Sequence, residues 1–104
     1  MRTVPLPSGF FGGCTGDDKA DERYERNARK AATAGLEPCE TCGRGVADGK
    51  GFAVVVTDGG ASILHPEDDT EDAWNDSGYM GGYVVGSTCA KQIPAEFRIT
   101  WRAS

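Results

Sequence analysis

The feature that most constrains the fold is a pair of cysteines separated by two residues. Cys39 and Cys42 stand in the segment Cys-Glu-Thr-Cys-Gly-Arg-Gly over residues 39–45. Its two glycines permit a tight turn in which backbone N–H groups point at the thiolates and stabilise their negative charge. Zn2+ prefers thiolate sulfur and imidazole nitrogen in tetrahedral sites. The segment therefore predicts a zinc knuckle, which supplies half of a structural metal site.

Two later residues are candidates for the other half of the site. Cys89 begins a predicted short helix, and the N-terminus of a helix lowers the pKa of a thiol and so favours metal binding. His65, the single histidine of the chain, ends a predicted strand. Cys14 is the alternative to His65 as fourth ligand, and a carboxylate or a water molecule is a further one. The predicted ligands of one structural Zn2+ are Cys39, Cys42, His65 and Cys89.

The small size of the chain makes such a metal useful for folding. A single domain of 104 residues buries only about two-thirds of the surface of its unfolded chain, so a metal is a common way to stabilise it. Four cysteines are also compatible with two disulfides. However, the sequence shows neither an apolar signal segment nor an apolar run near the roughly 18 residues that span a bilayer. We therefore expect a reduced, cytoplasmic protein that binds metal and is not in a membrane.

Hydrophobic periodicity and turn residues predict an α+β fold. An irregular arm over residues 1–16 precedes a single domain over 17–104, whose first helix has Asp17 or Asp18 as N-cap. Asp58-Gly59-Gly60 is a hairpin turn signal between two strands. The expected elements are a helix over 17–35, strands over 51–57 and 61–65, an acidic loop over 66–82, a strand over 83–86, a helix over 89–93, and a strand over 96–102 in which Phe97, Ile99 and Trp101 share one face.

A knuckle, a hairpin and a helix that begins with a cysteine follow one another in a treble-clef zinc finger. Residues 37–94 have this order. We therefore predict a small zinc-stabilised, treble-clef-like domain with an additional N-terminal helix and C-terminal strand. The usual treble clef takes two ligands from its final helix, whereas this helix offers only Cys89.

The net charge of −5 is concentrated in the middle of the chain. Residues 51–90 contain no Lys or Arg, so this stretch repels phosphate and attracts basic surfaces. Aromatic side chains beside carboxylates are suited to anchor a partner. We therefore expect a basic protein partner and disfavour nucleic acid. The predicted partner-binding residues are Glu67, Asp68, Asp69, Glu71, Asp72, Trp74, Asp76 and Tyr79.

Two short motifs also suggest a family. The knuckle is followed by the turn Asp58-Gly59-Gly60, the acidic loop and the motif Val85-Gly-Ser-Thr-Cys-Ala-Lys-Gln-Ile93. Over residues 37–94 this order resembles small zinc-knuckle proteins of actinobacterial bacteriophages, which pair a C-x2-C-G knuckle with a later V-G-x-x-C-A-K-x-[LI] motif. The resemblance implies metal bound by Cys39, Cys42 and Cys89 and implies no established activity.

These features predict a non-enzymatic, acidic, zinc-binding interaction protein encoded by a phage or another mobile element. It would bind and modulate a host protein, for example by inhibiting a defence or nucleic-acid-processing factor. The alternative is a nucleic-acid-binding zinc finger, since the 17–35 helix carries four basic residues over 23–30. An enzyme is disfavoured. His65-Pro66-Glu67 matches the H-x-E string of zinc deaminases, but it follows the cysteine pair instead of preceding it.

Overall fold

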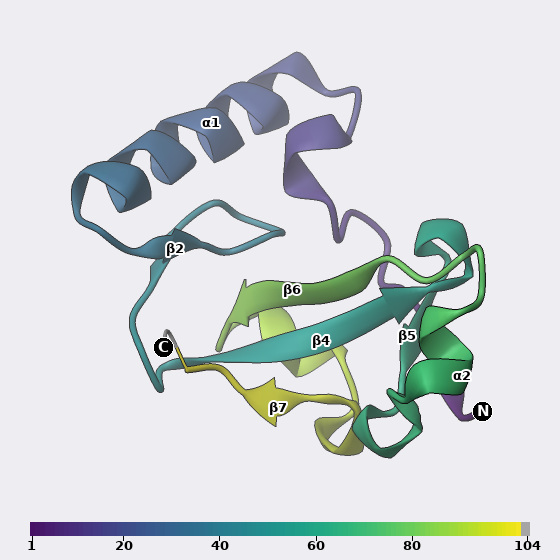
Figure 1. Cartoon of the computed structure of the whole chain (residues 1–104). Helices are drawn as coiled ribbons and strands as arrows, with labels where there is room; N and C mark the ends of the chain where they lie inside the picture. The colour runs from purple at the N-terminus through teal and green to yellow at the C-terminus, as the bar shows by residue number, and fades with distance from the viewer. Residues whose placement is uncertain (103–104) are drawn as a thin grey trace.

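The computed structural model describes residues 1–102, except for the side chain of Cys14. A long helix lies over a two-stranded sheet, and a separate five-stranded antiparallel sheet forms most of the remaining structure (Figure 1). The expected α+β class is confirmed. In the described part of the chain, no helix combines the length and the apolar character needed to cross a bilayer.

Helix α1 (Asp18–Thr33) is the helix expected over 17–35. Asp17 is its N-cap, because the side chain of Asp17 accepts hydrogen bonds from the backbone N–H groups of Lys19 and Ala20. After the helix, Gly35 takes a φ of 73°, which glycine adopts without the steric cost of a Cβ. The chain then turns back beneath the helix.

The partners of α1 are short elements near the knuckle. The helix packs on the 3-10 helix η1 (Gly12–Cys14) and on the two-stranded sheet of β2 (Glu37–Pro38) and β3 (Gly45–Val46). Ala31 is its buried residue. The small side chain of this alanine allows a close approach of α1 to the two-stranded sheet.

Strand β4 (Gly51–Thr57) is the centre of the five-stranded sheet. On one side it pairs along its length with β6 (Gly81–Gly86), from Gly51 opposite Gly86 to Val56 opposite Gly81. On the other side its first half pairs with β7 (Ile99–Thr100) and its second half with β5 (Ser62–Leu64). β1 (Thr3–Pro5) pairs with the free edge of β5.

Alternate residues of β4 enter two cores on opposite faces of the sheet. Val54 and Val56 belong to the larger core, which also contains Phe10 and Cys39. Val55 belongs to a smaller core with Leu64 and Ala73, the buried residue of helix α2 (Glu71–Trp74). The predicted cysteine ligand Cys39 is therefore part of the main core.

The arm over 1–16, which we expected to be irregular, is partly ordered into β1 and η1. Two contacts explain the difference. Phe10 is 3% exposed and lies in the larger core. The open edge of β5 also offers backbone groups that β1 pairs with.

Three other expected elements differ from the structure. The acidic loop contains the 3-10 helix η3 (Pro66–Asp68) as well as α2, and the helix expected over 89–93 is the 3-10 helix η4 (Cys89–Gln92). The strand expected over 96–102 is reduced to β7, because residues 95–97 form the 3-10 helix η5 (Ala95–Phe97). Phe97 is consequently 5% exposed while Ile99 is 47% exposed, so the alternation does not form one buried face.

Candidate metal centre

The knuckle is the turn between β2 and β3. The backbone N–H of Cys39 donates to the carbonyl oxygen of Arg44, and that of Gly43 donates to the carbonyl oxygen of Cys39, both over 2.8 Å. Gly43 has a φ of 78°, and a Cβ there would lie 2.5 Å from the carbonyl oxygen of Tyr24 in α1. Only glycine fits this conformation and this close approach. The motif therefore forms the tight turn that its glycines predict.

Contacts from three directions hold the knuckle in place. The backbone N–H of Glu40 donates to the carbonyl oxygen of Val84 in β6 over 2.9 Å. From α1, Nδ2 of Asn27 donates to the carbonyl oxygen of Cys42 over 2.9 Å. From the arm, the backbone N–H of Gly12 donates to the carbonyl oxygen of Glu40 over 3.0 Å. The position of the knuckle thus depends on tertiary structure as well as on its own sequence.

Cys89, at the start of η4, brings a third sulfur to the knuckle. The Sγ atoms of Cys39, Cys42 and Cys89 all lie within 4.8 Å of one another. Cys39 is fully buried and the other two are partly buried. The predicted meeting of these three cysteines is confirmed, and a group of this spacing could hold a metal ion.

The environment of Cys39 favours a thiolate. Burial by itself raises the pKa of its thiol, but backbone N–H groups of Gly86, Cys42 and Thr41 reverse the balance and lower it. The N–H of Gly86 donates to Sγ over 3.2 Å. Backbone N–H groups therefore shift the balance at this sulfur toward the thiolate, the form that binds a metal.

The thiol of Cys89 is hard to deprotonate unless a cation compensates the negative charge of the other two sulfurs. Burial, followed by the negative charges of Cys39 and Cys42, raises the pKa of the Cys89 thiol to about 12. Three neighbouring thiolates repel one another in a partly buried site. A divalent cation between them would remove that repulsion, so the chemistry of the donor set fits a thiophilic metal.

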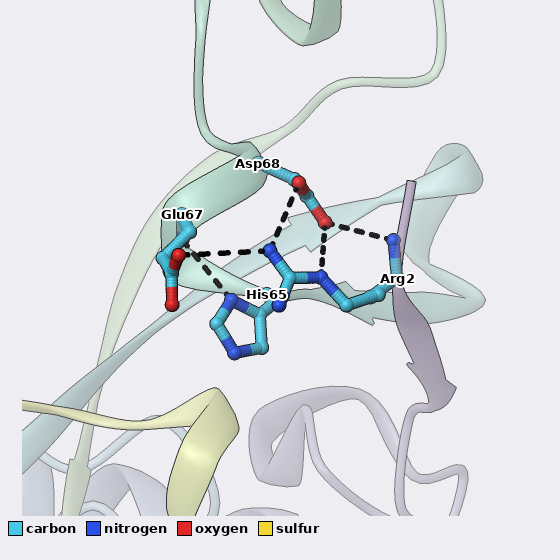
Figure 2. Close-up of polar contacts among 4 residues, drawn as sticks. All are labelled: Arg2, His65, Glu67 and Asp68. Carbon is cyan, nitrogen blue, oxygen red and sulfur yellow. Dashed lines mark hydrogen bonds and ion pairs between the residues drawn. The ribbon is translucent and has the colours of Figure 1, made fainter.

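The structure does not bring His65 to this group, contrary to the sequence-based expectation. His65 is the N-cap of η3 and follows β5, which pairs with β4 on the side opposite to β6. Its Nδ1 accepts a hydrogen bond from the backbone N–H of Glu67 over 3.1 Å (Figure 2). Its ring packs edge-on against Phe97, with 5.2 Å between the ring centroids. In this position His65 caps a turn and fills the core.

The alternative fourth ligand, Cys14, has a side chain that lies outside the described part of the chain. The backbone around it is described. Two residues earlier, the backbone N–H of Gly12 donates to the carbonyl oxygen of Glu40, and a Cβ on Gly12 would clash with the carbonyl oxygen of Thr41. The segment that carries Cys14 is therefore in direct contact with the knuckle.

We refer to the predicted partner-binding residues as the acidic surface. They lie on η3, at its C-cap Asp69, on α2 and in the segment after α2. Asp69 is its centre, because one of its carboxylate oxygens accepts hydrogen bonds from Nε1 of Trp74 and from the hydroxyl of Tyr79, both over 2.8 Å. Trp74 remains 56% exposed. The structure thus brings these three residues together as one cluster with an exposed indole.

Sequence reasoning missed the role of Arg2 at the edge of the acidic surface. Nε of Arg2 donates to a carboxylate oxygen of Asp68 over 3.1 Å, and the backbone N–H of Arg2 donates to the same oxygen over 2.8 Å (Figure 2). These hydrogen bonds hold the pKa of Asp68 at about 2. Glu67 is a weaker partner of Arg2, 3.9 Å from its guanidinium. Asp68 therefore anchors β1 and is partly neutralised.

Comparisons of the chain with protein-family models, with curated proteins and with solved structures give no match. The site is therefore interpreted from its own geometry.

Proposed function

We propose that this protein is a zinc-stabilised, non-enzymatic binding protein whose acidic surface contacts a basic protein surface. The observation that supports the zinc site best is the approach of three cysteine sulfurs to within 4.8 Å, next to backbone N–H groups that stabilise a thiolate. Zn2+ is the expected ion because sulfur-rich tetrahedral sites with Zn–S distances of about 2.3 Å are typical of structural zinc. The metal would link β2 and β3 to the end of β6.

Cys14 is the proposed fourth ligand. The docking of Gly12 on the knuckle supports this choice, as does the separation of His65 from the three cysteines. Four thiolates would complete a closed tetrahedral site, which is characteristic of a structural zinc and leaves no open position for catalysis. In this proposal the domain is treble-clef-like, with the 3-10 helix η4 in place of the usual final α-helix.

The acidic surface is the proposed contact with the partner. Asp69 holds the exposed Trp74 in a fixed orientation, so the indole loses little further freedom when it is buried by a partner. The exposed carboxylates of Glu71 and Asp72 lie beside it in the first turn of α2. A central aromatic group with surrounding negative charge is complementary to a basic groove that contains an apolar pocket.

The resemblance to phage zinc-knuckle proteins suggests where such a partner would be found. We propose that it is a host protein, and that the carboxylates compete with phosphate groups for its basic groove. Proteins that bind nucleic acid hold its phosphate groups in basic grooves, so occupation of such a groove would inhibit a nucleic-acid-processing or defence factor of this kind. The protein would act in the cytoplasm of the host bacterium.

A capture experiment with matched variants tests this function. Wild-type protein, Trp74→Ala, and the double variant Glu71→Gln with Asp72→Asn are immobilised and exposed to a lysate of the cell that carries the gene. The control is Glu22→Gln with Glu25→Gln, which removes two exposed carboxylates of α1. A basic partner retained by the wild type and the control, but lost with both test variants, would support the proposal. Equal capture by all four proteins would contradict it.

A further inference from the structure

A cavity of about 620 Å3 adjoins the cysteine group, between α1, the knuckle and the residues that follow β6. All three cysteines contribute to its wall. Its volume is within the range of about 300 to 1,000 Å3 that is common for small-molecule sites. This cysteine cavity is separate from the acidic surface, none of whose residues lines it.

The charge of the cysteine cavity is opposite to that of the whole protein. Arg23 of α1, Arg44 of the knuckle and Lys50 before β4 line it, and no Asp or Glu does. The chain as a whole has 16 acidic and 11 basic residues. Among the described residues, none of these three cations forms an ion pair with a carboxylate. Three separate segments thus bring positive charge to one cavity, with no ion pair to any carboxylate within residues 1–102.

The metal centre alone does not account for this charge. Zn2+ with three thiolates has a formal charge of −1, and with four thiolates it has −2. The three cations together carry a charge of +3, which is larger than the negative charge of the metal centre in either case. A net positive charge of at least one therefore remains at the cavity. Like charges are brought together at an energetic cost, which a bound anion would offset.

We propose that the cysteine cavity binds a small molecule with a phosphate group, which Arg23, Arg44 and Lys50 hold. Arg23, Arg44 and Lys50 are exposed at the rim of the cavity, where they can reach an anion. A dianion suits three cations at one cavity better than a single carboxylate does, and one guanidinium group can donate two parallel hydrogen bonds to phosphate oxygens. The hydroxyls of Ser87 and Thr88 in the cavity wall are additional donors. The volume leaves room for an organic group beside Tyr24 and Val46. This inference does not depend on the acidic surface.

Titration of the zinc-loaded, isotope-labelled protein, followed by amide NMR, tests the proposal. The probes are adenosine 5′-monophosphate, adenosine and inorganic phosphate at constant ionic strength. We expect the monophosphate to shift the amide signals of residues 23, 44, 50 and 86–89, and adenosine to leave them unchanged. Binding of inorganic phosphate alone at these residues would also support the phosphate site and would show that the organic group is not recognised.

Two charge-removing variants and one control complete the test. Arg23→Gln and Arg44→Gln should each weaken monophosphate binding about tenfold, the ratio expected for the loss of one charge-assisted contact. Arg29→Gln, which removes a charge from α1 outside this cavity, should leave the affinity for the monophosphate unchanged. Metal content is measured on the same samples, so that a lost zinc site is not mistaken for lost anion binding.

Three results would overturn the proposal. The first is no shift with millimolar monophosphate or phosphate on folded, zinc-loaded protein. The second is an equal loss of affinity in Arg29→Gln and Arg44→Gln, which would indicate a diffuse attraction to basic residues inside and outside the cavity. The third is binding of a single-stranded oligonucleotide at the same residues without binding of the mononucleotide, which would identify the cavity as part of a nucleic-acid interface.

Discussion

The backbone N–H of Gly86 donates a hydrogen bond to Sγ of Cys39 over 3.2 Å, although the two residues are 47 positions apart in the sequence. Gly86 is the last residue of β6 and pairs with Gly51 at the start of β4. The register of the central sheet therefore sets the position of the N–H group that stabilises the first sulfur. Assembly of the three-cysteine group and formation of the sheet are coupled through this contact.

Removal of the metal is expected to unfold the protein. Binding free energy at a structural zinc is folding free energy, with apparent values of about 10 to 16 kcal/mol in zinc-finger peptides. We expect about one zinc per chain in purified protein, and loss of circular dichroism and thermal cooperativity after chelation. Cys39→Ser and Cys89→Ser should give the same result without chelator. Full retention of structure without metal would contradict the proposed zinc site.

His65→Ala distinguishes the observed role of this residue from the role expected from sequence. The structure predicts that the variant keeps its zinc, because His65 is on the far side of β4 from β6. The free energy of unfolding of the variant should nevertheless fall by about 1 to 3 kcal/mol. The reason is that the substitution removes the N-cap acceptor of η3 and the ring contact with Phe97. Elemental analysis and urea unfolding measure the two effects separately. In Cys14→Ser, by contrast, we expect a loss of metal affinity.

The difference between Cys89 and His65 shows what the sequence predicts and what it does not. Cys39 and Cys42 share one turn, and Cys89 begins the 3-10 helix after β6, so local motifs were sufficient to select all three as candidate ligands. Their meeting depends in addition on the contacts between the knuckle and β6. His65 is separated from Cys42 by 22 residues, a spacing that is compatible with a zinc ligand. Its location, however, depends on which edge of β4 accepts β5, and hydrophobic pattern does not determine strand order.

The ends of the chain were difficult to predict for a related reason. β1 exists because β5 is left with an unpaired edge, and a strand of three residues with a proline has little propensity of its own. In the same way, Phe97 and Ile99 alternate as in a half-buried strand. The 3-10 turn η5 nevertheless places only Phe97 in the core. Strand pairing in the first case, and packing of Phe97 in the larger core in the second, outweigh the local pattern.

Gly12→Ala tests the contact between the arm and the knuckle. A Cβ on Gly12 would lie 1.7 Å from the carbonyl oxygen of Thr41, so one of the two backbones must move. We expect a loss of about 2 kcal/mol or more in thermal unfolding, together with weaker zinc retention. Gly82→Ala is the control, because a Cβ there meets no atom closer than 4.0 Å. Similar stabilities of the two variants would show that the arm does not dock on the knuckle.

The Arg2–Asp68 contact predicts a pH dependence at the N-terminus. The side chain and the backbone N–H of Arg2 donate to Asp68 and lower its pKa from 3.8 to about 2. A carboxyl whose folded pKa is depressed stabilises the fold fully above its unfolded pKa, and this contribution is lost as the pH falls through the folded pKa. The β1–β5 pairing should therefore weaken between about pH 4 and pH 2.

Carboxyl NMR titration and amide exchange of Val4, which is paired with Ile63, measure this change. Asp68→Asn should show faster exchange at Val4 already at neutral pH and little further change on acidification. Glu71→Gln, an exposed substitution in α2, is the control. An ordinary titration midpoint near pH 4 for Asp68 would exclude the anchoring role.

Phe10→Ala is expected to be the most destabilising aromatic substitution in the arm. Phe10 is 3% exposed, lies in the larger core and meets Phe11 edge-on, with 5.0 Å between the ring centroids. Truncation of a buried phenylalanine costs about 3 to 5 kcal/mol, because burial is lost and a cavity remains. Ile99→Ala, at a residue that is 47% exposed, should cost less than about 1 kcal/mol. Urea unfolding of the two variants measures both values, and a cost for Phe10→Ala no greater than that for Ile99→Ala would mean that the arm is not part of the core.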